Sequence, residues 1–279
     1  MRLLGRGNRG PARGEGAVTS FIHFDVSGGV ARLTLDNPRR LNAMNAEMWQ
    51  AMPGLLRRVA EDPAIRVLVL AGAGERAFCT GNDISEFDTI RNNPEAAARY
   101  NGWQREVAHG LQRMEKPIIA AMHGYCLGAG FEFALMADFR HAAADTRVGI
   151  PAVRLGLPYR LEDIEKVADV VGLGRAREMV LLGRQYGGEE LRELGLAQQV
   201  LPDIAAMEAS VAELARELAA NAPLSLRAAK IAFQELARRE GPPDRARTDV
   251  AEDACYASAD YAEGRRAKAE KRPPVFTGA

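Results

Sequence analysis

The chain has 279 residues, of which 47% are hydrophobic and 27% are charged, the composition of a globular protein that can build a sizeable core in one large domain or two. Lys and Arg together number 37, as do Asp and Glu, so the net charge is zero and gives no general attraction to nucleic acid or to an anionic membrane surface. Cys79, Cys126 and Cys255 are widely spaced and include no CxxC pair, which argues against a disulfide framework and against a zinc site. We therefore expect a cytoplasmic protein with reduced thiols, no metal centre and no nucleic-acid or membrane partner.

The N-terminal segment differs in composition from the rest of the chain. It begins MRLLGRGNRGPARGEG, which is rich in Arg and Gly. Because this segment has no apolar stretch of the kind found in a secretory signal, it does not predict export. We expect residues 1–20 to form a disordered extension.

The first folded elements are predicted from short apolar runs between turn residues. FIHFDVSGGVARLTLD (21–36) contains two runs rich in Phe, Val, Ile and Thr around Ser-Gly-Gly, which predicts a β-hairpin. Residues 45–60 have helical spacing, interrupted by Pro53. RVLVLAGAG (66–74) is a continuous apolar run that ends in glycines, so we expect a buried strand that enters a loop.

Two helices are predicted in the next segment. Asp83 and Glu86 have the spacing of a capping box at the start of DISEF, which predicts that a helix begins there. Residues 94–114 have the composition and the N-terminal proline of a longer helix.

The most informative apolar run is PIIAAMHGYCLGAGFEFALMA (117–137), whose one formal charge is Glu132. It has the length of a membrane span, but a charge at mid-bilayer costs about 2.5–3.5 kcal/mol. We expect instead a buried strand over residues 117–122, a glycine loop, and a helix from about residue 130. Strand, loop and helix then occur in this order twice, which favours an α/β fold with a parallel sheet.

From residue 161 onward the pattern is mainly helical. Segments such as LEDIEKVADVVG, GRAREMVLLG and IAAMEASVAELARELAANA have helical spacing and are separated by Gly or Pro. We therefore predict that the last hundred or so residues are mostly helix.

Two loops share one design, AFCTGNDI (77–84) and YCLGAGFE (125–132). In each, a buried strand runs into a glycine-containing turn and then a helix, whose N-terminus carries unpaired N–H groups. Two such N–H groups that converge from different loops form an oxyanion hole, which stabilises an enolate or a tetrahedral oxyanion. The alternative is that both loops are simply tight connections between strand and helix.

These loops and their flanks carry a strong resemblance to the crotonase, or enoyl-CoA hydratase/isomerase, superfamily. The likeness covers residues 21–279. The segments that carry it are AFCTGNDISEF (77–87), KPIIAAMHGYCLGAGFEFALMADFRHAA (116–143), DTRVGIPAVRLGLP (145–158), GRAREMVLLGRQY (174–186) and EKRPPVFTG (270–278). The resemblance implies a crotonase-like spiral of ββα units over residues 21–200 and a helical C-terminal oligomerisation region over residues 201–279. It also implies a homotrimer or a dimer of trimers.

The resemblance also implies roles for individual residues. The backbone N–H groups of Asn82 and Ala129 are expected to form the oxyanion hole, and Glu132 to act as the catalytic acid/base. The substrate is expected to be an acyl-CoA thioester, with coenzyme A as part of the substrate and no separate cofactor. The residues expected to bind the acyl group or CoA are Cys79, Gly81, Asp83, Ile84, Gly128, Ala152, Lys271 and Phe276.

The sequence departs from the family pattern at the second carboxylate. Family hydratases carry a glutamate after the proline of a segment like VGIPA, where this chain has Ala152. Hydration is usually explained by one carboxylate that activates water and a second that protonates the α-carbon. Tyr159, Glu162 and Asp163 are the candidate replacements. Two further departures are Ser85 and Lys268, where the family often has Lys and Phe.

The function predicted on this basis is that of an acyl-CoA lyase or isomerase of the enoyl-CoA hydratase type. Two alternatives remain open at this point. One is another enolate reaction on the same fold, such as isomerisation, decarboxylation or thioester hydrolysis. The other is a non-catalytic acyl-CoA-binding protein that retains the fold.

Overall fold

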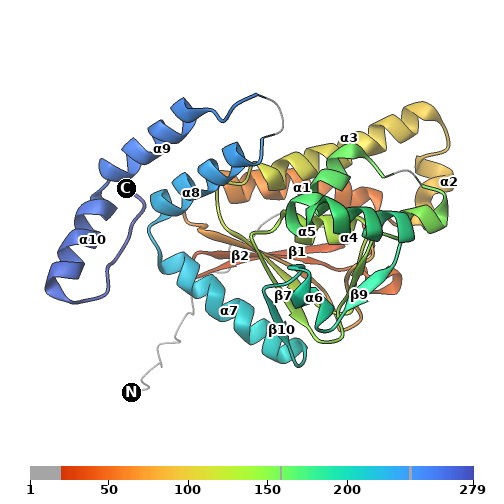
Figure 1. The fold of residues 1–279 in the computed structure, drawn as a ribbon, viewed down its shortest axis with the longest axis horizontal. Coiled ribbons are helices and arrows are strands. Elements are labelled where there is room, and N and C mark those ends of the chain that lie inside the picture. The colour runs from red at the N-terminus through yellow and green to blue at the C-terminus, as the bar shows by residue number, and fades with distance from the viewer. Residues whose placement is uncertain (1–19, 158, 239–240) are drawn as a thin grey trace, which may run out of the picture.

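The structure is a computed structural model that describes residues 20–157, 159–238 and 241–279. Residues 1–19, in which we expected a disordered extension, lie outside the described part. The described chain forms two β-sheets with helices on both faces of the larger one, as Figure 1 shows. The predicted α/β class is confirmed. No described helix has both the length and the apolar character that a membrane span requires.

The larger sheet is built on the predicted hairpin. Within the described residues it has six strands, in the spatial order β1 (Ile22–Ser27), β2 (Val30–Leu35), β3 (Val67–Gly72), β5 (Ile118–Met122), β7 (Phe139–Ala143) and β10 (Gln199–Leu201). The β1–β2 pair is antiparallel, and the other pairings in this sheet are parallel. Parallel strands buried on both faces read as continuous apolar runs, which is why residues 66–74 and 117–122 predicted them correctly.

The smaller sheet lies where the long strands end. Within the described residues it contains β4 (Ala77–Cys79), β6 (Tyr125–Leu127), β8 (Arg147–Gly149) and β9 (Gln185–Gly187). Strands β3, β5 and β7 each lead through a turn into the next short strand, and a helical segment follows each time. This repeat is the spiral of ββα units that the resemblance implies. The turn before β6 needs glycine, because Gly124 has φ +52° and a Cβ there would lie 2.1 Å from the Arg76 carbonyl oxygen.

The helices come in two groups. Those between residues 38 and 193 are η1 (Pro38–Arg40), α1 (Ala46–Glu61), η2 (Ile84–Glu86), α2 (Phe87–Ile90), α3 (Pro94–Gln112), α4 (Ala129–Met136), η3 (Pro151–Leu155), α5 (Leu161–Leu182) and α6 (Glu190–Glu193), where η marks a 3₁₀ helix. The C-terminal group is α7 (Ile204–Ala220), α8 (Pro223–Leu236), α9 (Arg245–Tyr256) and α10 (Ala259–Glu270). The predicted helical character of the last hundred or so residues is confirmed, although β9 and β10 interrupt it.

The larger sheet separates two layers of core. On one face, side chains such as Leu68 and Leu70 of β3 pack with apolar residues of α1, α3, α4 and α5. On the other face, Val67 and Val69 of β3 pack with apolar residues of α7, including Val211. Helix α7 therefore completes the core of its own chain, whereas Figure 1 shows α9 and α10 standing apart from the sheets.

The predicted capping box at residues 83–86 is not formed. The Asp83 carboxylate does accept a hydrogen bond from the backbone N–H of Ser85, at 3.1 Å. However, the N–H of Asp83 donates to the Met44 carbonyl, and the Glu86 carboxylate accepts from the N–H of Ala46 at 2.8 Å. Glu86 thus joins the start of α1 to the start of α2 instead of closing its own helix turn.

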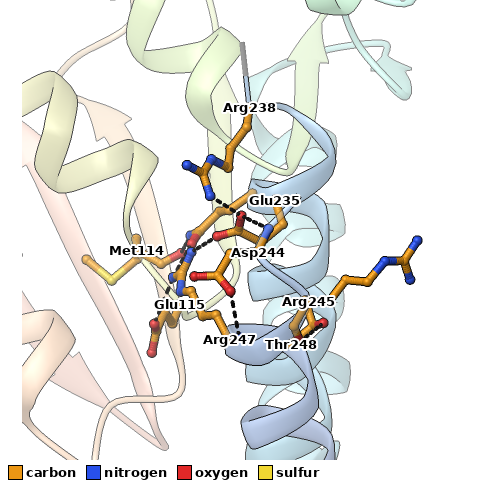
Figure 2. A network of polar contacts seen from close by, with 9 residues as sticks. Met114, Glu115, Glu235, Arg238, Asp244, Arg245, Arg247 and Thr248 are labelled. Carbon is orange, nitrogen blue, oxygen red and sulfur yellow. Dashed lines mark hydrogen bonds and ion pairs between the residues drawn. The ribbon is translucent and has the colours of Figure 1, made fainter. Parts of the chain in front are cut away.

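The C-terminal helices are attached to the body of the protein through Glu235 at the end of α8. Its carboxylate, only 5% exposed, accepts hydrogen bonds from the backbone N–H of Asp244 at 2.9 Å, from Arg247 at 2.7 Å and from Arg238 at 3.1 Å. Arg247 also reaches Glu115 at 3.3 Å, as Figure 2 shows. The N–H of Asp244 and the Arg247 guanidinium lower the pKa of Glu235 to about 2. One carboxylate therefore fixes how α8, α9 and the segment before β5 meet.

We predict that Glu235→Gln lowers stability near neutral pH. A carboxyl whose pKa falls on folding stabilises the native state above its unfolded pKa, and this stabilisation is lost as the pH falls through the folded pKa of about 2. The difference in thermal midpoint between wild type and variant should therefore be full at pH 7 and shrink below about pH 4.5. Thermal unfolding across pH 2.5–7 measures it, with exposed Glu217→Gln on α7 as the control. A difference that stays constant down to pH 2.5 would contradict the assigned role of Glu235.

Candidate active site

A cavity of about 220 Å³ lies where the two glycine loops meet the middle of α3, η3 and the segment after η3. Several residues predicted for the site line it together, namely Gly81, Asn82, Ile84, Gly128, Ala129, Glu132 and Ala152. Two of the three candidates for the second proton carrier, Tyr159 and Asp163, also line it, whereas Glu162 does not. The fold therefore brings residues from positions 80–163 into one small space.

The two glycine loops touch each other at this cavity. Gly81 has φ +96°, and a Cβ there would lie 3.3 Å from the backbone nitrogen of Ala129 and 3.2 Å from the carbonyl oxygen of Leu127. Gly128 has φ +52° and stands directly before α4. Both residues are in backbone conformations that L side chains rarely adopt, so glycine permits the close approach of the loops.

The two N–H groups expected to form the oxyanion hole come from these loops. Ala129 is the first residue of α4, and the first N–H groups of a helix have no partner within it. The bridge between Met44 and Asn82 uses the Gly81 carbonyl and the N–H of Asp83, and so does not occupy the N–H of Asn82. Both residues line the cavity, and their N–H groups take no part in the Met44–Asn82 bridge.

Helix α4 is held tightly against strand β4. A Cβ at Gly130 would lie 2.2 Å from the carbonyl oxygen of Cys79 and 2.6 Å from its Cβ. Cys79 itself is fully buried and accepts the N–H of Gly81 on its sulfur at 3.4 Å. Burial raises the pKa of the Cys79 thiol to about 12, so the thiol supports the loop as a neutral group. Cys79, which was expected to bind the substrate, does not line the cavity.

Glu132 lies one turn into α4, three residues after Ala129. Its Oε1 accepts a hydrogen bond of 2.7 Å from the Tyr159 hydroxyl. Burial raises the pKa of Glu132, and the nearby Asp163 raises it further, while the Tyr159 hydroxyl, Lys166 and Arg160 act in the opposite direction. The sequence left the direction of this pKa undecided, and in the structure it is upward because burial outweighs the hydrogen bond and the nearby cations.

Asp163 sits behind the pair and is itself compensated. It is 3% exposed and accepts hydrogen bonds from Arg160 at 2.7 and 3.2 Å and from Lys166 at 3.0 Å. A buried carboxylate with this many charge-assisted partners is best explained as the anchor of the first turn of α5. Of the three candidates for the second proton carrier, Tyr159 alone makes a hydrogen bond to Glu132 within the described chain, at 2.7 Å.

Tyr159 carries a hydroxyl that keeps its proton. Its pKa is raised well above the ordinary value, first by burial and then by the charge of Glu132. The hydroxyl therefore acts as a hydrogen-bond donor at neutral pH. A neutral phenol and a carboxyl group with a raised pKa, in direct contact, form a pair that can exchange a proton.

Helix α3 supplies a polar wall that the sequence analysis did not identify. The Asn82 side-chain oxygen accepts hydrogen bonds from Gln104 at 2.8 Å and from the Tyr100 hydroxyl at 3.2 Å. Asn101, one turn before Gln104, lines the cavity together with Arg91. The available signal was the spacing of Tyr100, Asn101 and Gln104 on one face of the predicted helix 94–114.

The remaining predicted residues lie elsewhere. Asp83 is 8% exposed and does not line the cavity, because it caps the turn after Asn82. Lys271 follows the last residue of α10, and Phe276 packs over Gly264 of the same helix. Helix α10 lies on the opposite side of the molecule from α4, as Figure 1 shows. Phe276 lines a larger cavity of about 530 Å³ between α8, α9 and α10. That cavity contains neither glycine loop, so it lacks the convergent N–H groups of the smaller one.

Comparisons with known proteins agree with this geometry. A family model described as enoyl-CoA hydratase/isomerase matches residues 25–279. The chain is 29% identical over 251 residues to the short-chain-enoyl-CoA hydratase of Clostridium acetobutylicum, covering 90% of this chain and 95% of that one. It is 36% identical to a mevalonyl-coenzyme A hydratase of Beauveria bassiana, covering 70% and 71% respectively.

Solved structures show the same similarity. The crystal structure of an enoyl-CoA hydratase/carnithine racemase from Magnetospirillum magneticum superposes with a TM-score of 0.86 at 34% identity, covering 94% of this chain and 97% of that one. An enoyl-CoA hydratase from Bacillus anthracis gives a TM-score of 0.83 at 28% identity, covering 92% and 99%. The likeness thus extends over nearly the whole chain in both directions.

Proposed function

The chain belongs to the enoyl-CoA hydratase/isomerase family, and from this premise we propose that it hydrates 2-enoyl-CoA thioesters with Glu132 and Tyr159 as its two proton carriers. The observation that carries the proposal is the 2.7 Å hydrogen bond between these side chains beside the two converging glycine loops. The named hydratases among the relatives support this direction of chemistry. Coenzyme A enters as part of the substrate, and no further cofactor is part of the proposal.

The thioester oxygen is bound by the backbone. The N–H groups of Asn82 and Ala129 donate to it, and the positive end of the α4 dipole points the same way. These donors act most strongly when negative charge develops on that oxygen, which is when the enolate forms. Their contribution is therefore to the transition state more than to the bound substrate.

The proton transfers balance without an external acid. Oε2 of Glu132 takes a proton from water, and the water oxygen bonds to the β-carbon while the double-bond electrons move toward the thioester, forming the enolate. The enolate α-carbon then takes the proton of the Tyr159 hydroxyl. The Glu132 carboxyl group then turns so that the proton on Oε2 passes to the phenolate, and one water has been added.

Tyr159 thus takes the place of the carboxylate that is missing at Ala152. Ala152 lines the same cavity but offers no ionisable group. The raised pKa of Tyr159 keeps its proton in place until the enolate forms, and a phenol is still a stronger acid than the α-carbon of a thioester. Reactions that need one carboxylate, such as isomerisation, remain possible at the same site but leave the position of Tyr159 unexplained.

We predict that Tyr159→Phe lowers kcat/KM for crotonyl-CoA hydration by about 10²–10⁴-fold, because one positioned acid is removed. Glu132→Gln should cost a similar factor, and the double variant should be only slightly worse than either single variant, because the two groups act as a unit. Tyr125→Phe, an exposed tyrosine outside the cavity, is the matched control. Full activity of Tyr159→Phe would refute the second-carrier role. No Glu132-dependent turnover of any acyl-CoA would favour a binding protein.

We further predict that Ala129→Pro lowers the rate by about 10²–10³-fold, since it deletes one oxyanion donor. The first position of a helix tolerates proline, so α4 should still form. Ala129→Gly keeps the N–H and serves as the control. Both variants are checked for the wild-type unfolding transition before the rates are compared. A proline variant that unfolds normally and retains the rate would show that this N–H does not bind the thioester.

We also propose that the protein assembles as a homotrimer or a dimer of trimers in the cytoplasm. Phe233, Leu236 and Val250 on α8 and α9 are 67%, 73% and 71% exposed, which is a large apolar surface for an isolated chain. The cytoplasmic location is a prediction from the unpaired cysteines. Sedimentation at low micromolar concentration should show a species of three or six chains. A single species of 30.3 kDa would exclude a stable trimer.

A further inference from the structure

Arg91 is a half-buried cation in the wall of the cavity. It follows α2, and its guanidinium carbon lies 4.7 Å from the centre of the Phe87 ring and 5.1 Å from the centre of the Tyr100 ring. One of its terminal nitrogens donates to the side-chain oxygen of Asn101 at 3.1 Å. Two rings and one amide thus fix the plane of the guanidinium, which limits the conformations it must lose when a ligand binds.

The charge of Arg91 has no carboxylate partner in the described chain. Four charged residues line the cavity, namely Arg91, Glu132, Arg160 and Asp163. Arg160 is bound to Asp163, whereas none of the ion pairs of the described residues includes Arg91. An arginine has five N–H donors, and the Asn101 contact uses one. Arg91 therefore brings positive charge and unused donors to a cavity in which the other cation is neutralised.

Two of the acidic residues that precede Arg91 in the sequence, Asp83 and Glu86, are engaged elsewhere. Asp83 accepts from the backbone and side chain of Ser85, at 3.1 and 2.6 Å. Glu86 accepts from the backbone of Ala46 at 2.8 Å. These contacts hold both carboxylates in the loop, and no ion pair of the described residues joins Asp88 to Arg91, which leaves the guanidinium able to bind the anion of a ligand.

The position of Arg91 relates it to the acyl part of the substrate. The Tyr100 hydroxyl binds Asn82, whose N–H is the proposed oxyanion donor, and the ring of the same Tyr100 carries Arg91. Two residues one turn apart on α3 lie along the same path: Gln104 donates to Asn82, and Asn101 accepts from Arg91. The polar wall thus runs from Asn82, the proposed oxyanion donor, to Arg91. The mouth of the cavity is marked by Ile84, which is 59% exposed.

On the basis of the proposed function, we propose that Arg91, positioned by Asn101, binds a carboxylate at the far end of the acyl group. The preferred substrates are then 2-enoyl-CoA esters whose acyl chain ends in a carboxylate, and acyl groups ending in a cation are excluded. A planar guanidinium with two donors on one edge matches a carboxylate in geometry and charge. A phosphate of CoA is the other anion with this chemistry, and the experiment separates the two.

The experiment measures binding of unreactive saturated esters to the full-length protein by titration calorimetry. Succinyl-, glutaryl- and adipyl-CoA are compared with butyryl-, pentanoyl- and hexanoyl-CoA, which match them in length but lack the carboxylate. At the length that reaches Arg91, the wild type should bind the carboxylate ester about 10-fold tighter or more, as expected for a charge-assisted hydrogen bond. Arg91→Gln should abolish this ratio, whereas Arg105→Gln, an exposed arginine on α3 outside the cavity, should preserve it.

Two other outcomes would overturn the proposal that Arg91 binds the acyl carboxylate. No preference for the carboxylate at any of the three lengths would show that Arg91 does not bind the acyl end. Equal weakening of all six esters by Arg91→Gln would assign Arg91 to a CoA phosphate. Because these esters do not react, the result is independent of catalysis. Failure of the wild type to hydrate crotonyl-CoA and the carboxylate-ended enoyl esters would count against the proposed function alone.

Discussion

The site depends on the contact between the loop after β4 and the first turn of α4. The backbone of Cys79 leaves no room for a Cβ at Gly130, and Gly81 lies against the nitrogen of Ala129. Gly81, Gly128 and Gly130 therefore set the distance between the N–H groups of Asn82 and Ala129, which belong to different ββα units. Since backbone positions in packed structures shift little, the two N–H groups would be oriented as proposed donors before any substrate arrives, which is the condition for electrostatic catalysis.

The chemistry beside this contact comes from tertiary structure more than from any single segment. Glu132 is supplied by α4, but its pKa is shifted by burial and then by Asp163 and Tyr159, which follow it by about thirty residues, in the first turn of α5 and just before it. The compensation of Asp163 by Arg160 and Lys166 keeps a buried carboxylate close to Glu132 without leaving it unpaired. The pKa of Glu132 is thus set in part by groups at and just before the start of a neighbouring helix.

The sequence predicted the parts of this arrangement that local pattern controls. Glu132 stood out because it was the one formal charge in an apolar run, and the strands of residues 66–74 and 117–122 stood out because parallel strands are apolar on both faces. The direction of the Glu132 pKa was not predictable, since it depends on Asp163 in space. The capping box does not form because the Glu86 carboxylate accepts a hydrogen bond from the backbone N–H of Ala46, forty positions earlier. Strands β9 and β10 have three residues each, too few to show a period.

Glu132 and Ala129 share one turn of α4, whereas Arg91, Asn101 and Gln104 are carried by α2, α3 and the turn between them. The reacting centre and the surface that would read the acyl tail are therefore parts of separate structural units that meet at Asn82. Insertions, deletions or substitutions between residues 85 and 105 can change the surface proposed to contact the end of the acyl group. The proposed donors, Asn82 and Ala129, and the proposed proton carriers, Glu132 and Tyr159, would keep their spacing. Such an architecture lets one reaction be inherited intact while substrate choice diverges, with the α2–α3 segment as the place where related enzymes would differ most.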